Sequence, residues 1–440
     1  MGSQPRYQSW GRFPAAAPVG VQPLRFRDQP LPRMPGSVLP VGNGRSYGDS
    51  CLNNGGYLLA TRGLDRFLAF DPQTGLLRCE AGVLLSAVLS LTVGGGWFLP
   101  VTPGTRFITV GGAIANDVHG KNHHVAGTFG HQVTRLELLR STGERVCCSP
   151  AEHPDLFAAT IGGLGLTGLI TWAEFRLQRI ANAYVQVERT RFSHLDGFFD
   201  LALGADRAHE YTVAWIDCLA TGKQLGRGIY MAGNHAAPTC EGSPKAPGRP
   251  VSIPFDPPLS LVARPTLRVF NELFFRKQVR SVQSGLEHYA PFFYPLDGID
   301  QWNRIYGPAG FLQYQSVVPL AVSRDATREM LRCIAQSGQG SFLSVLKVFG
   351  DRAPAGLLSF PRPGVTLALD FPFKGRSTLR LCDTLDALVA HAGGAIYPAK
   401  DARMSPRMFA AGYPRLDQFR RSLDPAFSSS FWRRVTGAAA

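Results

Sequence analysis

The spacing of apolar residues in the first 180 positions is typical of short β-strands separated by tight turns. Alternating or continuous apolar runs are bounded by Gly, Pro, Asn and Asp, as strands in a layered domain are. These runs cover residues 55–63, 66–82, 96–105, 133–150 and 166–180. Between them, apolar residues recur at helical spacing over 84–93 and 154–161. The pattern predicts an α+β domain whose glycines are concentrated at strand ends.

From about residue 183 the pattern changes to longer alternating strands. Two examples are TVAWIDCL (212–219) and FLQYQSVVPLAV (311–322), and residues 324–336 have helical spacing. An apolar strand face must be covered by another layer. The sequence therefore predicts a second domain, built on an antiparallel sheet with helical cover.

A proline-rich segment interrupts this second domain at about 233–265. It holds eight prolines in 33 residues and few apolar clusters, a composition that does not support a packed element. A loop of this length in a compact domain is usually a lid, a partner-binding arm or an unstructured stretch. The sequence predicts a flexible segment and leaves these three roles open.

Composition limits the class of protein. With 440 residues, 45% of them hydrophobic, the chain can bury a large core. The sequence has no run of about 20 apolar residues that could cross a bilayer, and its N-terminus lacks the pattern of an export signal. Its eight cysteines form no CxxC pair, so neither a zinc ribbon nor a disulfide framework is indicated. We expect a globular protein in a reducing, cytoplasmic setting.

The net charge of +14 favours an anionic partner. Nucleic acid, a phosphorylated substrate and the cytoplasmic membrane leaflet all have the required charge. A general bias towards arginine explains the charge equally well. The chain has no nucleic-acid-binding motif, so we expect no nucleic-acid partner.

Three glycine-rich segments lie in the first domain. VGNGRSYGDS (41–50) and PGTRFITVGGAIA (103–115) have enough glycine to turn consecutive backbone amides towards one anion, such as a pyrophosphate. IGGLGLTG (161–168) leads into an alternating strand. Each segment alone is more often a plain turn, because none matches GxGxxG or the P-loop. Together they suggest one extended ligand held by several loops.

HGKNHH (119–124) follows the second glycine-rich segment, and its histidines have three possible roles. They could bind a metal, form a polar loop wall, or line a ligand pocket. His119 and His123 would share one face of a helix, but Gly120 and Asn122 disfavour a helix there. The sequence favours a pocket lining or a loop wall, and we predict no metal.

These segments together resemble the FAD-binding domain of vanillyl-alcohol-oxidase-type flavoenzymes, which is also called the PCMH type. The resemblance extends nearly end to end, and its motifs are GRSYGD (44–49), PGTR with TVGGAIA (103–115), HGKNHH (119–124), GLTG (165–168), NRIYGPAGFLQYQ (303–315), SFLSVLKVFG (341–350) and YPAKDAR (397–403). HGKNHH and YGPAGFLQYQ are specific to the subgroup that oxidises a polyprenylphosphoryl ribose. The resemblance implies a FAD-binding domain over 1–182, completed by 395–440, and a substrate-binding domain over 183–394.

Position by position, the resemblance assigns residues to three parts of a site. The FAD pyrophosphate would be held by Arg45, Ser46, Tyr47, Gly48, Asp49, Gly104, Thr109, Gly111 and Gly112. The flavin ring would be lined by Asn116, His119, Ile170 and Tyr397. The substrate would face Lys121, Gln313, Gln315, Lys347 and Lys400. Relatives with a covalent flavin have a histidine in the first glycine loop, where this chain has Ser46 and Tyr47, so the FAD is expected to be non-covalent.

Oxidation of an alcohol needs a hydride acceptor, which no side chain provides, and a base for the hydroxyl proton. Lys400 and His119 are the candidate catalytic bases. We favour Lys400, provided that burial beside Lys121 or Arg403 lowers its pKa. A lysine in an arbitrary sequence context would more often be a solvated surface charge.

The implied reaction removes the C2 hydride of a polyprenylphosphoryl-β-D-ribose and gives the 2-keto sugar, the first half of epimerisation to the arabinose form. A separate NADH-dependent short-chain reductase would complete the epimerisation. A lipid substrate also implies peripheral membrane association, through the proline-rich segment and the aromatic cluster HYAPFFYPLDGIDQWNRIYG (288–307). For about half of the aromatic residues in this cluster, ordinary core packing is the simpler explanation.

Two other functions stay open at the level of sequence. The same flavin domain could serve an oxidase of soluble sugar lactones or alditols, because the glycine loops do not specify the substrate. A non-catalytic basic protein that binds lipid or nucleic acid is the alternative from another class.

Overall fold

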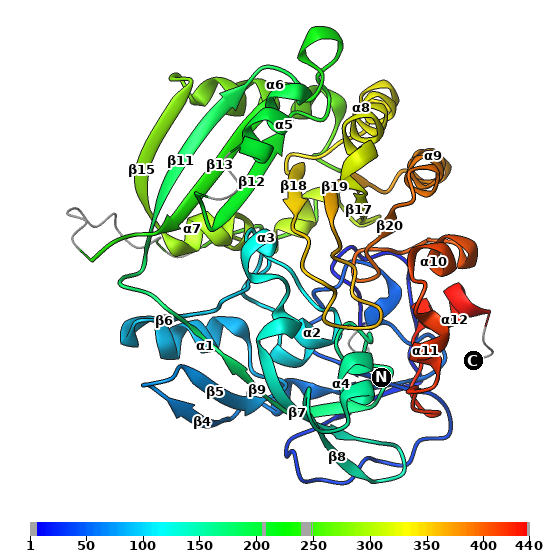
Figure 1. Cartoon of the computed structure of the whole chain (residues 1–440). Helices are drawn as coiled ribbons and strands as arrows, with labels where there is room; N and C mark the ends of the chain where they lie inside the picture. Colours follow the sequence, from blue (N-terminus) through cyan, green and yellow to red (C-terminus); the bar gives the residue numbers. More distant parts are fainter. Residues whose placement is uncertain (1–6, 205–207, 239–247, 249, 438–440) are drawn as a thin grey trace.

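A computed structural model describes residues 7–204, 208–238, 248 and 250–437, and Figure 1 shows it coloured along the chain. Helices and antiparallel sheets are combined in an α+β fold, which confirms the predicted class. The glycine-rich segments lie in the lower part of Figure 1, and the largest sheet lies above them.

The lower part contains two sheets and a short strand pair. The antiparallel sheet has the order β4 (Phe67–Asp71), β5 (Leu76–Glu80), β9 (Leu169–Arg176), β7 (Val133–Leu139) and β8 (Arg145–Cys148). The parallel sheet has the order β1 (Gly20–Pro23), β3 (Tyr57–Ala60) and β2 (Val38–Val41), and the antiparallel pair is β6 (Trp97–Phe98) with β10 (Gln178–Arg179). The helices here are α1 (Leu85–Thr92), α2 (Val110–Ala115), α3 (His123–Ala126) and α4 (Pro154–Thr160). Helices α1 and α4 confirm the helical spacing found over 84–93 and 154–161.

The alternation in these strands has a clear physical basis. In β5, Leu77 and Cys79 are fully buried, whereas Arg78 between them is partly exposed. Successive side chains of a strand point to opposite faces, so the apolar pair enters the core. Arg78 then pairs with Glu174 of the neighbouring strand β9 at 2.7 Å.

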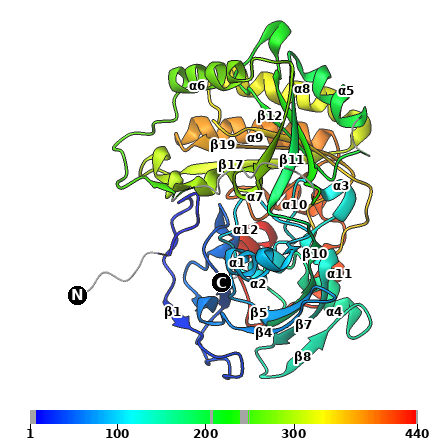
Figure 2. The ribbon, with the colours of Figure 1, turned by 90° about the vertical axis from the view of Figure 1, so that its left-hand side faces the viewer.

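The largest sheet has eight antiparallel strands. Their order is β15 (Val282–His288), β11 (Tyr184–Phe192), β13 (Gly228–His235), β12 (Tyr211–Ile216), β18 (Val345–Phe349), β19 (Gly364–Pro372), β17 (Phe311–Val318) and β20 (Ala395–Ile396). Along its upper side in Figure 2 lie α5 (Leu195–Gly204), α6 (Arg264–Lys277), α8 (Leu320–Ser337) and α9 (Arg376–His391). This sheet with its helices confirms the predicted second antiparallel layer.

Other short elements connect these layers. Helix α7 (Tyr289–Phe293) contacts β11 and β15, and β14 (Val251–Ser252) pairs in parallel with β16 (Ile299–Asp300). Single turns of 3-10 helix are η1 (Asp49–Cys51), η2 (Thr61–Gly63), η3 (Val93–Gly95), η4 (Phe129–Gln132), η5 (Gly222–Gln224), η6 (Pro295–Gly298) and η7 (Trp302–Tyr306). In the described part of the chain, no helix combines the length and apolar character that a membrane crossing requires.

One predicted strand is too long. The alternating run over 311–322 ends as a strand at Val318, and α8 begins at Leu320 rather than near residue 324. Pro319 lies between the two elements and cannot donate a hydrogen bond to a strand ladder. The apolar residues after it are therefore part of the first turn of the helix.

The C-terminal segment returns to the first glycine loop. It forms α10 (Pro406–Gly412), α11 (Leu416–Arg420) and α12 (Ser430–Thr436). Phe427 forms a parallel bridge with Val38, and the backbone amide of Ser430 donates to the carbonyl oxygen of Leu52 at 2.8 Å. Residues far apart in the sequence therefore meet beside the first glycine loop, whereas the domain boundaries at 182 and 395 stay predictions.

The two segments expected to face a membrane have structural contacts in their described parts, while their flexibility and membrane contact stay predictions. Residues 239–247 and 249 of the proline-rich segment lie outside the described residues, but its described remainder includes parts of β13 and α6 and all of β14. Its Leu261 amide donates to the carbonyl oxygen of Ile305 at 2.8 Å, so this remainder is not free coil. In the aromatic cluster 288–307, Phe292, Phe293 and Trp302 are buried and pack in the core, because apolar rings are stabilised there.

Candidate active site

A cavity of about 330 Å³ lies between the glycine-rich loops and the eight-stranded sheet. The structure brings most of the predicted site residues together on its walls. From the glycine-rich part these are Arg45, Ser46, Tyr47, Gly104, Thr109, Gly111, Gly112, Asn116, His119, Lys121 and Ile170. From the large sheet and the turn after it these are Gln313, Gln315, Lys347, Tyr397 and Lys400. Of the predicted residues, only Gly48 and Asp49 are absent from this lining.

The first glycine loop presents unused hydrogen-bond donors at the cavity. Within the described part of the chain, the backbone amides of residues 43–46 donate to no protein acceptor. Arg45 stacks on Trp10, with its guanidinium carbon 3.8 Å from the ring centroid, and its buried Nε has no partner among the described residues. Consecutive free amides beside a fixed cation suit an anion such as a pyrophosphate.

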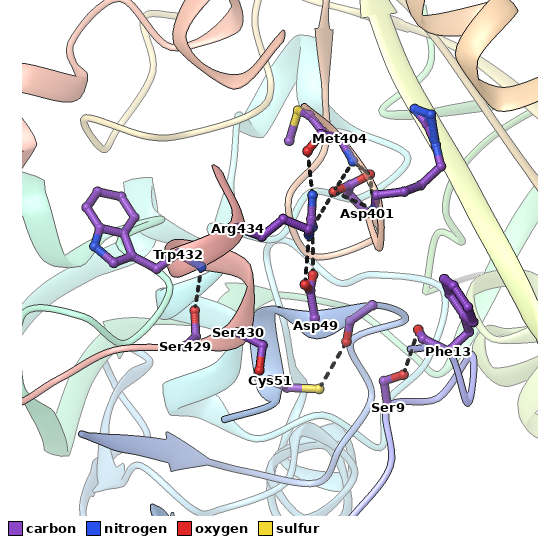
Figure 3. Close-up of polar contacts among 12 residues, drawn as sticks. Ser9, Phe13, Asp49, Cys51, Asp401, Met404, Ser429, Ser430, Trp432 and Arg434 are labelled. Carbon is purple, nitrogen blue, oxygen red and sulfur yellow. Dashed lines mark hydrogen bonds and ion pairs between the residues drawn. The ribbon is translucent and has the colours of Figure 1, made fainter. Parts of the chain in front are cut away.

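Gly48 and Asp49 have structural contacts beside the cavity, and their place at the pyrophosphate stays a prediction. Figure 3 shows Arg434 of α12 between Asp49 and Asp401. Its guanidinium forms two hydrogen bonds to Asp49, at 2.7 and 2.9 Å, and one to Asp401 at 2.8 Å. A Cβ on Gly48 would lie 1.6 Å from the carbonyl oxygen of Asp401, so only glycine allows this approach. The Asp49 carboxylate is directed towards α12, whereas Ser50 and Cys51, the other residues of η1, line the cavity.

The second glycine-rich segment folds into a helix rather than an open turn. Thr109 caps α2 by accepting a hydrogen bond from the Gly112 amide at 3.1 Å. The helix ends at Ala115, and the carbonyl oxygen of the next residue, Asn116, accepts a hydrogen bond from the Tyr397 hydroxyl at 2.8 Å. A Cβ on Gly111 would lie 3.0 Å from the Ala81 side chain, so this glycine permits close packing of α2 on the strand behind it.

His119 is a neutral, buried hydrogen-bonding residue in the cavity wall. Burial lowers its pKa well below the ordinary value, and the nearby ammonium of Lys347 lowers this pKa further. The side-chain amide of Gln315 donates to Nε2 of His119 at 2.9 Å and to the Thr366 hydroxyl at 3.2 Å. The proton of the neutral ring is then on Nδ1, which is buried and has no partner among the described residues. With Nε2 occupied, this histidine is suited to donate from Nδ1 rather than to accept a proton.

The other histidines of HGKNHH have contacts of their own. Nδ1 of His123 accepts a hydrogen bond from the Gly350 amide at 3.2 Å, and Nε2 of His124 lies 3.1 Å from the carbonyl oxygen of His209. Among the described residues, no group of three or more His, Cys, Asp or Glu side chains is placed to hold a metal ion.

Lys121 and Lys347 are buried cations held by carbonyl oxygens. The ammonium of Lys121 donates to the carbonyl oxygen of Phe292, and that of Lys347 donates to the carbonyl oxygen of Gly120 at 3.1 Å. Burial lowers the pKa of Lys121 to about 7 and that of Lys347 to about 8. Because a carbonyl oxygen does not neutralise a buried ammonium, both lysines favour an anionic ligand.

Lys400 has a titratable partner that the sequence did not suggest. Burial lowers the pKa of Lys400 to about 7, while the carboxylate of Asp370 opposes this change and the ammonium of Lys347 adds to it. Burial raises the pKa of Asp370 to about 7, and its oxygens accept hydrogen bonds from Gln313 at 2.7 Å and Tyr306 at 3.4 Å. A base near neutrality is therefore available inside the cavity.

Burial is the largest cause of this low pKa, as expected, but the charged neighbours of Lys400 differ from the expected ones. Burial beside Lys121 or Arg403 was expected, but Arg403 forms ion pairs with Asp383 and Asp386. These two carboxylates compensate its charge. The acting neighbours of Lys400 are Asp370 and Lys347.

Two further residues of the site were missed by sequence reasoning. Trp10 lines the cavity and stacks on Arg45, but it precedes the glycine loop in a segment without a motif. Asp370 had a usable signal, since a charged residue inside the apolar strand VTLALDFP requires a buried partner. The partner, Gln313, lies directly opposite Asp370 in the register of β17 and β19.

Comparison with known proteins identifies the class of this site. A family model described as an FAD binding domain matches residues 33–149, the stretch that contains the first two glycine-rich segments. The fold, the cavity and this match define the chain as an FAD-dependent oxidoreductase.

The relatives identify the family within that class. The decaprenylphosphoryl-β-D-ribose oxidase of Mycolicibacterium smegmatis is 37% identical over 422 residues, which cover 90% of this chain and 89% of the relative. The chain belongs to the family of this oxidase. An uncharacterized protein of Streptomyces coelicolor, named for its place in the mprA 5′ region, is 34% identical over 372 residues, or 80% of this chain and 100% of the relative. The Delta(24)-sterol reductase of Homo sapiens is 36% identical over only 110 residues, 25% of this chain and 21% of the relative.

The residues present fit FAD. The free amides of residues 43–46 and the unpartnered Nε of Arg45 suit its pyrophosphate, and the unpartnered Nδ1 of His119 offers a donor deeper in the cavity. When bound, FAD supplies the hydride acceptor that the side chains lack.

Proposed function

We propose that this enzyme oxidises the C2 hydroxyl of a polyprenylphosphoryl-β-D-ribose to the 2-keto sugar, with FAD as hydride acceptor. The single observation that carries the substrate class is the placement of three buried lysines in one cavity. Lys121 and Lys347 are held by carbonyl oxygens, and the carboxylate of Asp370 acts on Lys400. Such a cavity is stabilised when an anionic group enters, and a sugar phosphodiester supplies that charge.

Lys400 is the proposed base. In its neutral form, Nζ accepts the proton of the C2 hydroxyl, and the resulting ammonium is stabilised by the carboxylate of Asp370. The face of the Tyr47 ring, whose centroid lies 3.7 Å from Nζ, stabilises the same charge. Asp370 is a positioning residue here, because Gln313 and Tyr306 fix its carboxylate near the lysine.

Two lysines and a histidine complete the proposed chemistry. Lys121 and Lys347 pair with the substrate phosphate, which removes their uncompensated charge. The Nδ1–H group of His119 donates a hydrogen bond to the part of the bound ligand beside it, and so orients that part of the ligand. Gln315 holds the histidine in that tautomer through the 2.9 Å hydrogen bond.

The FAD is proposed to be non-covalent. The first glycine loop contains no histidine, and the cysteine that lines the cavity beside it, Cys51, is poorly reactive. Burial raises the pKa of the Cys51 thiol to about 12, so the thiolate required for attack does not form near neutrality. Acid precipitation should therefore release the flavin into the supernatant, and yellow colour retained in the pellet would contradict this.

Anaerobic mixing tests the proposed reaction. We expect polyprenylphosphoryl ribose to bleach the FAD-loaded enzyme, whereas free alditols and sugar lactones leave it yellow. The opposite pattern would favour the soluble-substrate oxidase instead. The family assignment already contradicts the non-catalytic alternative.

The product of this step also implies a partner. A 2-keto sugar that is to become the arabinose epimer must receive a hydride from the opposite face, so we propose a separate NADH-dependent short-chain reductase as the consuming enzyme. A lipid-linked substrate further implies that the enzyme works at a membrane surface.

A further inference from the structure

Exposed apolar side chains are concentrated in one stretch of this protein. Ten of the large apolar residues exposed in the described part of the chain lie between 251 and 299: Val251, Phe255, Leu259, Leu261, Val269, Phe270, Leu273, Val279, Val282 and Ile299. The other eight are scattered over the rest of the sequence. Concentrated exposure of this kind marks an interaction site more often than ordinary surface.

Helix α6 lies in the middle of this stretch, and its inner side fixes its orientation. Leu267 and Asn271 are buried. The side-chain amide of Asn271 donates to Asp217 at 2.7 Å, and the ring of Phe274 packs on Trp215 with centroids 4.6 Å apart. These contacts leave the opposite side of the helix facing outwards.

The outer side of α6 combines apolar and basic residues. Val269 and Leu273 are 61% and 66% exposed and lie one helical turn apart. We define the α6 surface as Val269, Leu273 and, just after the helix, Val279, together with the exposed cations Arg264, Arg268, Arg276, Lys277 and Arg280. The acid of this helix, Glu272, is already paired with Arg227 at 2.6 Å and with Arg276. The α6 surface is therefore strongly cationic.

The inner side of α6 also reaches the wall of the active-site cavity. Trp215, on which Phe274 packs, lines the cavity. Its indole nitrogen donates to the carbonyl oxygen of Phe342 at 3.0 Å, and the ring of Phe342 contacts that of Phe270 at 4.8 Å. The next residue, Leu343, lines the cavity as well. One layer of side chains thus separates the α6 surface from the cavity.

We propose that the α6 surface docks on an anionic lipid membrane, with Val269 and Leu273 at the boundary of the acyl chains and the cations at the lipid phosphates. The proposal rests on the lipid-linked substrate proposed above, which must reach the cavity from a bilayer. Apolar residues flanked by cations are the pattern of an interfacial helix. A second copy of the chain would fit poorly, because a symmetric contact would place the cations of both copies opposite each other.

Vesicle flotation tests this surface with the FAD-loaded full-length enzyme. We expect binding to vesicles of phosphatidylcholine with phosphatidylglycerol and much weaker binding to phosphatidylcholine alone. The double variant Val269→Ser/Leu273→Ser should lower the partition coefficient about tenfold or more. Lys277→Gln/Arg280→Gln should lower it by about fivefold per charge removed. The matched control Leu320→Ser/Val322→Ser, on the exposed start of α8, should bind as the native enzyme does.

The outcomes separate this proposal from the proposed reaction. Equal vesicle binding by the native enzyme and the Val269→Ser/Leu273→Ser variant would overturn the α6 surface as the docking site. A native dimer that the same variant dissociates, without vesicle binding, would assign the surface to a second copy and also overturn the proposal. Flavin bleaching by a short-chain, detergent-soluble polyprenylphosphoryl ribose should be the same in the variant and the native enzyme. If this substrate bleached neither the variant nor the native enzyme, the result would instead contradict the proposed reaction.

Discussion

The two ends of the active-site cavity are built by different means. At the glycine-rich end, the ligand-facing groups are backbone amides, fixed by the path of the chain through residues 43–46. At the other end they are buried side chains, led by Lys347 and Lys400, whose pKa values lie near neutrality. Backbone amides do not titrate, whereas lysine side chains change charge with pH. Ligand binding at the glycine-rich end should thus depend on the path of the backbone, and the chemistry at the other end should depend on the charges of the side chains.

The two ends nevertheless share one scaffold. The Tyr47 amide donates to the carbonyl oxygen of Ala399 at 3.0 Å, next to Lys400. Arg434 joins Asp49, near the end of the first glycine-rich segment, to Asp401, the residue after the base Lys400. A substitution at the junction formed by Arg434, Asp49 and Asp401 should affect both ends of the cavity. A substitution within one end should affect only that end.

The largest effect is expected from Lys400→Ala. Loss of a general base slows a reaction about 10²–10⁴-fold, so flavin reduction by the lipid-linked sugar should fall by that factor. FAD should remain bound, because the glycine-rich end is untouched. Stopped-flow bleaching and the flavin absorbance of the purified protein measure the two quantities. The exposed Lys374 gives the control Lys374→Ala, which should be as fast as the native enzyme. A native rate in Lys400→Ala would remove this lysine from the mechanism.

Arg434→Met should cause the largest loss of stability. It leaves Asp49 and Asp401 buried without their cation, and such a loss costs about 3–5 kcal/mol. Urea unfolding measures this change in the free energy of unfolding. As a control, Arg420→Met removes an exposed pair with Asp417 and should cost less than about 1 kcal/mol. Equal stability of the two variants would show that the junction is not a structural requirement.

Gly42→Ala should weaken FAD binding without changing the pH dependence of the reaction. A Cβ here would lie 2.4 Å from Oγ1 of Thr109, the residue that caps α2. Overpacking of this kind costs about 1–3 kcal/mol, and both glycine segments must shift to relieve it. Titration of the apoprotein with FAD measures the dissociation constant. Gly94→Ala, where an added Cβ meets no protein atom within 4 Å among the described residues, is the matched control and should bind FAD normally.

The sequence predicted local features better than the directions in which side chains point. Strand alternation and the helical spacing of α1 and α4 are local patterns, so they could be read directly. Gly48 and Asp49 were grouped with the phosphate-binding residues because they belong to the same motif. Their actual partners, Asp401 and Arg434, lie more than 350 positions further along the chain, and a single sequence contains no signal for that contact.

The charged end of the cavity was predicted only in part, again because the missing contact joins residues that are far apart in the sequence. HGKNHH and YPAKDAR placed Lys121 and Lys400 in the site, but the neighbour that sets the proton affinity of Lys400 was missed. Asp370 reaches it through the pairing of β19 with β17. These two strands are not consecutive in the sequence, so no hairpin turn fixes their register. Arg403 was expected as a charged neighbour of Lys400 because it is close in the sequence, whereas the actual charged neighbours are Asp370 and Lys347.

The smallest expected effect, a shift in pH profile, tests the charged end most sharply. If neutral Lys400 is the base, the rate of flavin reduction at saturating substrate should rise as the pH passes about 7. Asp370→Asn removes a negative charge that favours the protonated lysine, so the midpoint should move to lower pH. Lys347→Met removes a positive charge that disfavours it, so the midpoint should move to higher pH. The limiting rate of Asp370→Asn at high pH should stay within about tenfold of the native rate, because the base itself is retained.

The opposite signs of these two shifts exclude a merely structural explanation. Damage to the packing of the cavity would lower the limiting rate in both variants, but it would not move the midpoints in opposite directions. Shifts of the same sign, or midpoints that do not move, would mean that a group other than Lys400 titrates. Gly42→Ala serves as the control from the other end of the cavity: its affinity for FAD should fall while its midpoint stays at the native pH. A midpoint that moved in Gly42→Ala would mean that the two ends of the cavity are not electrostatically separate.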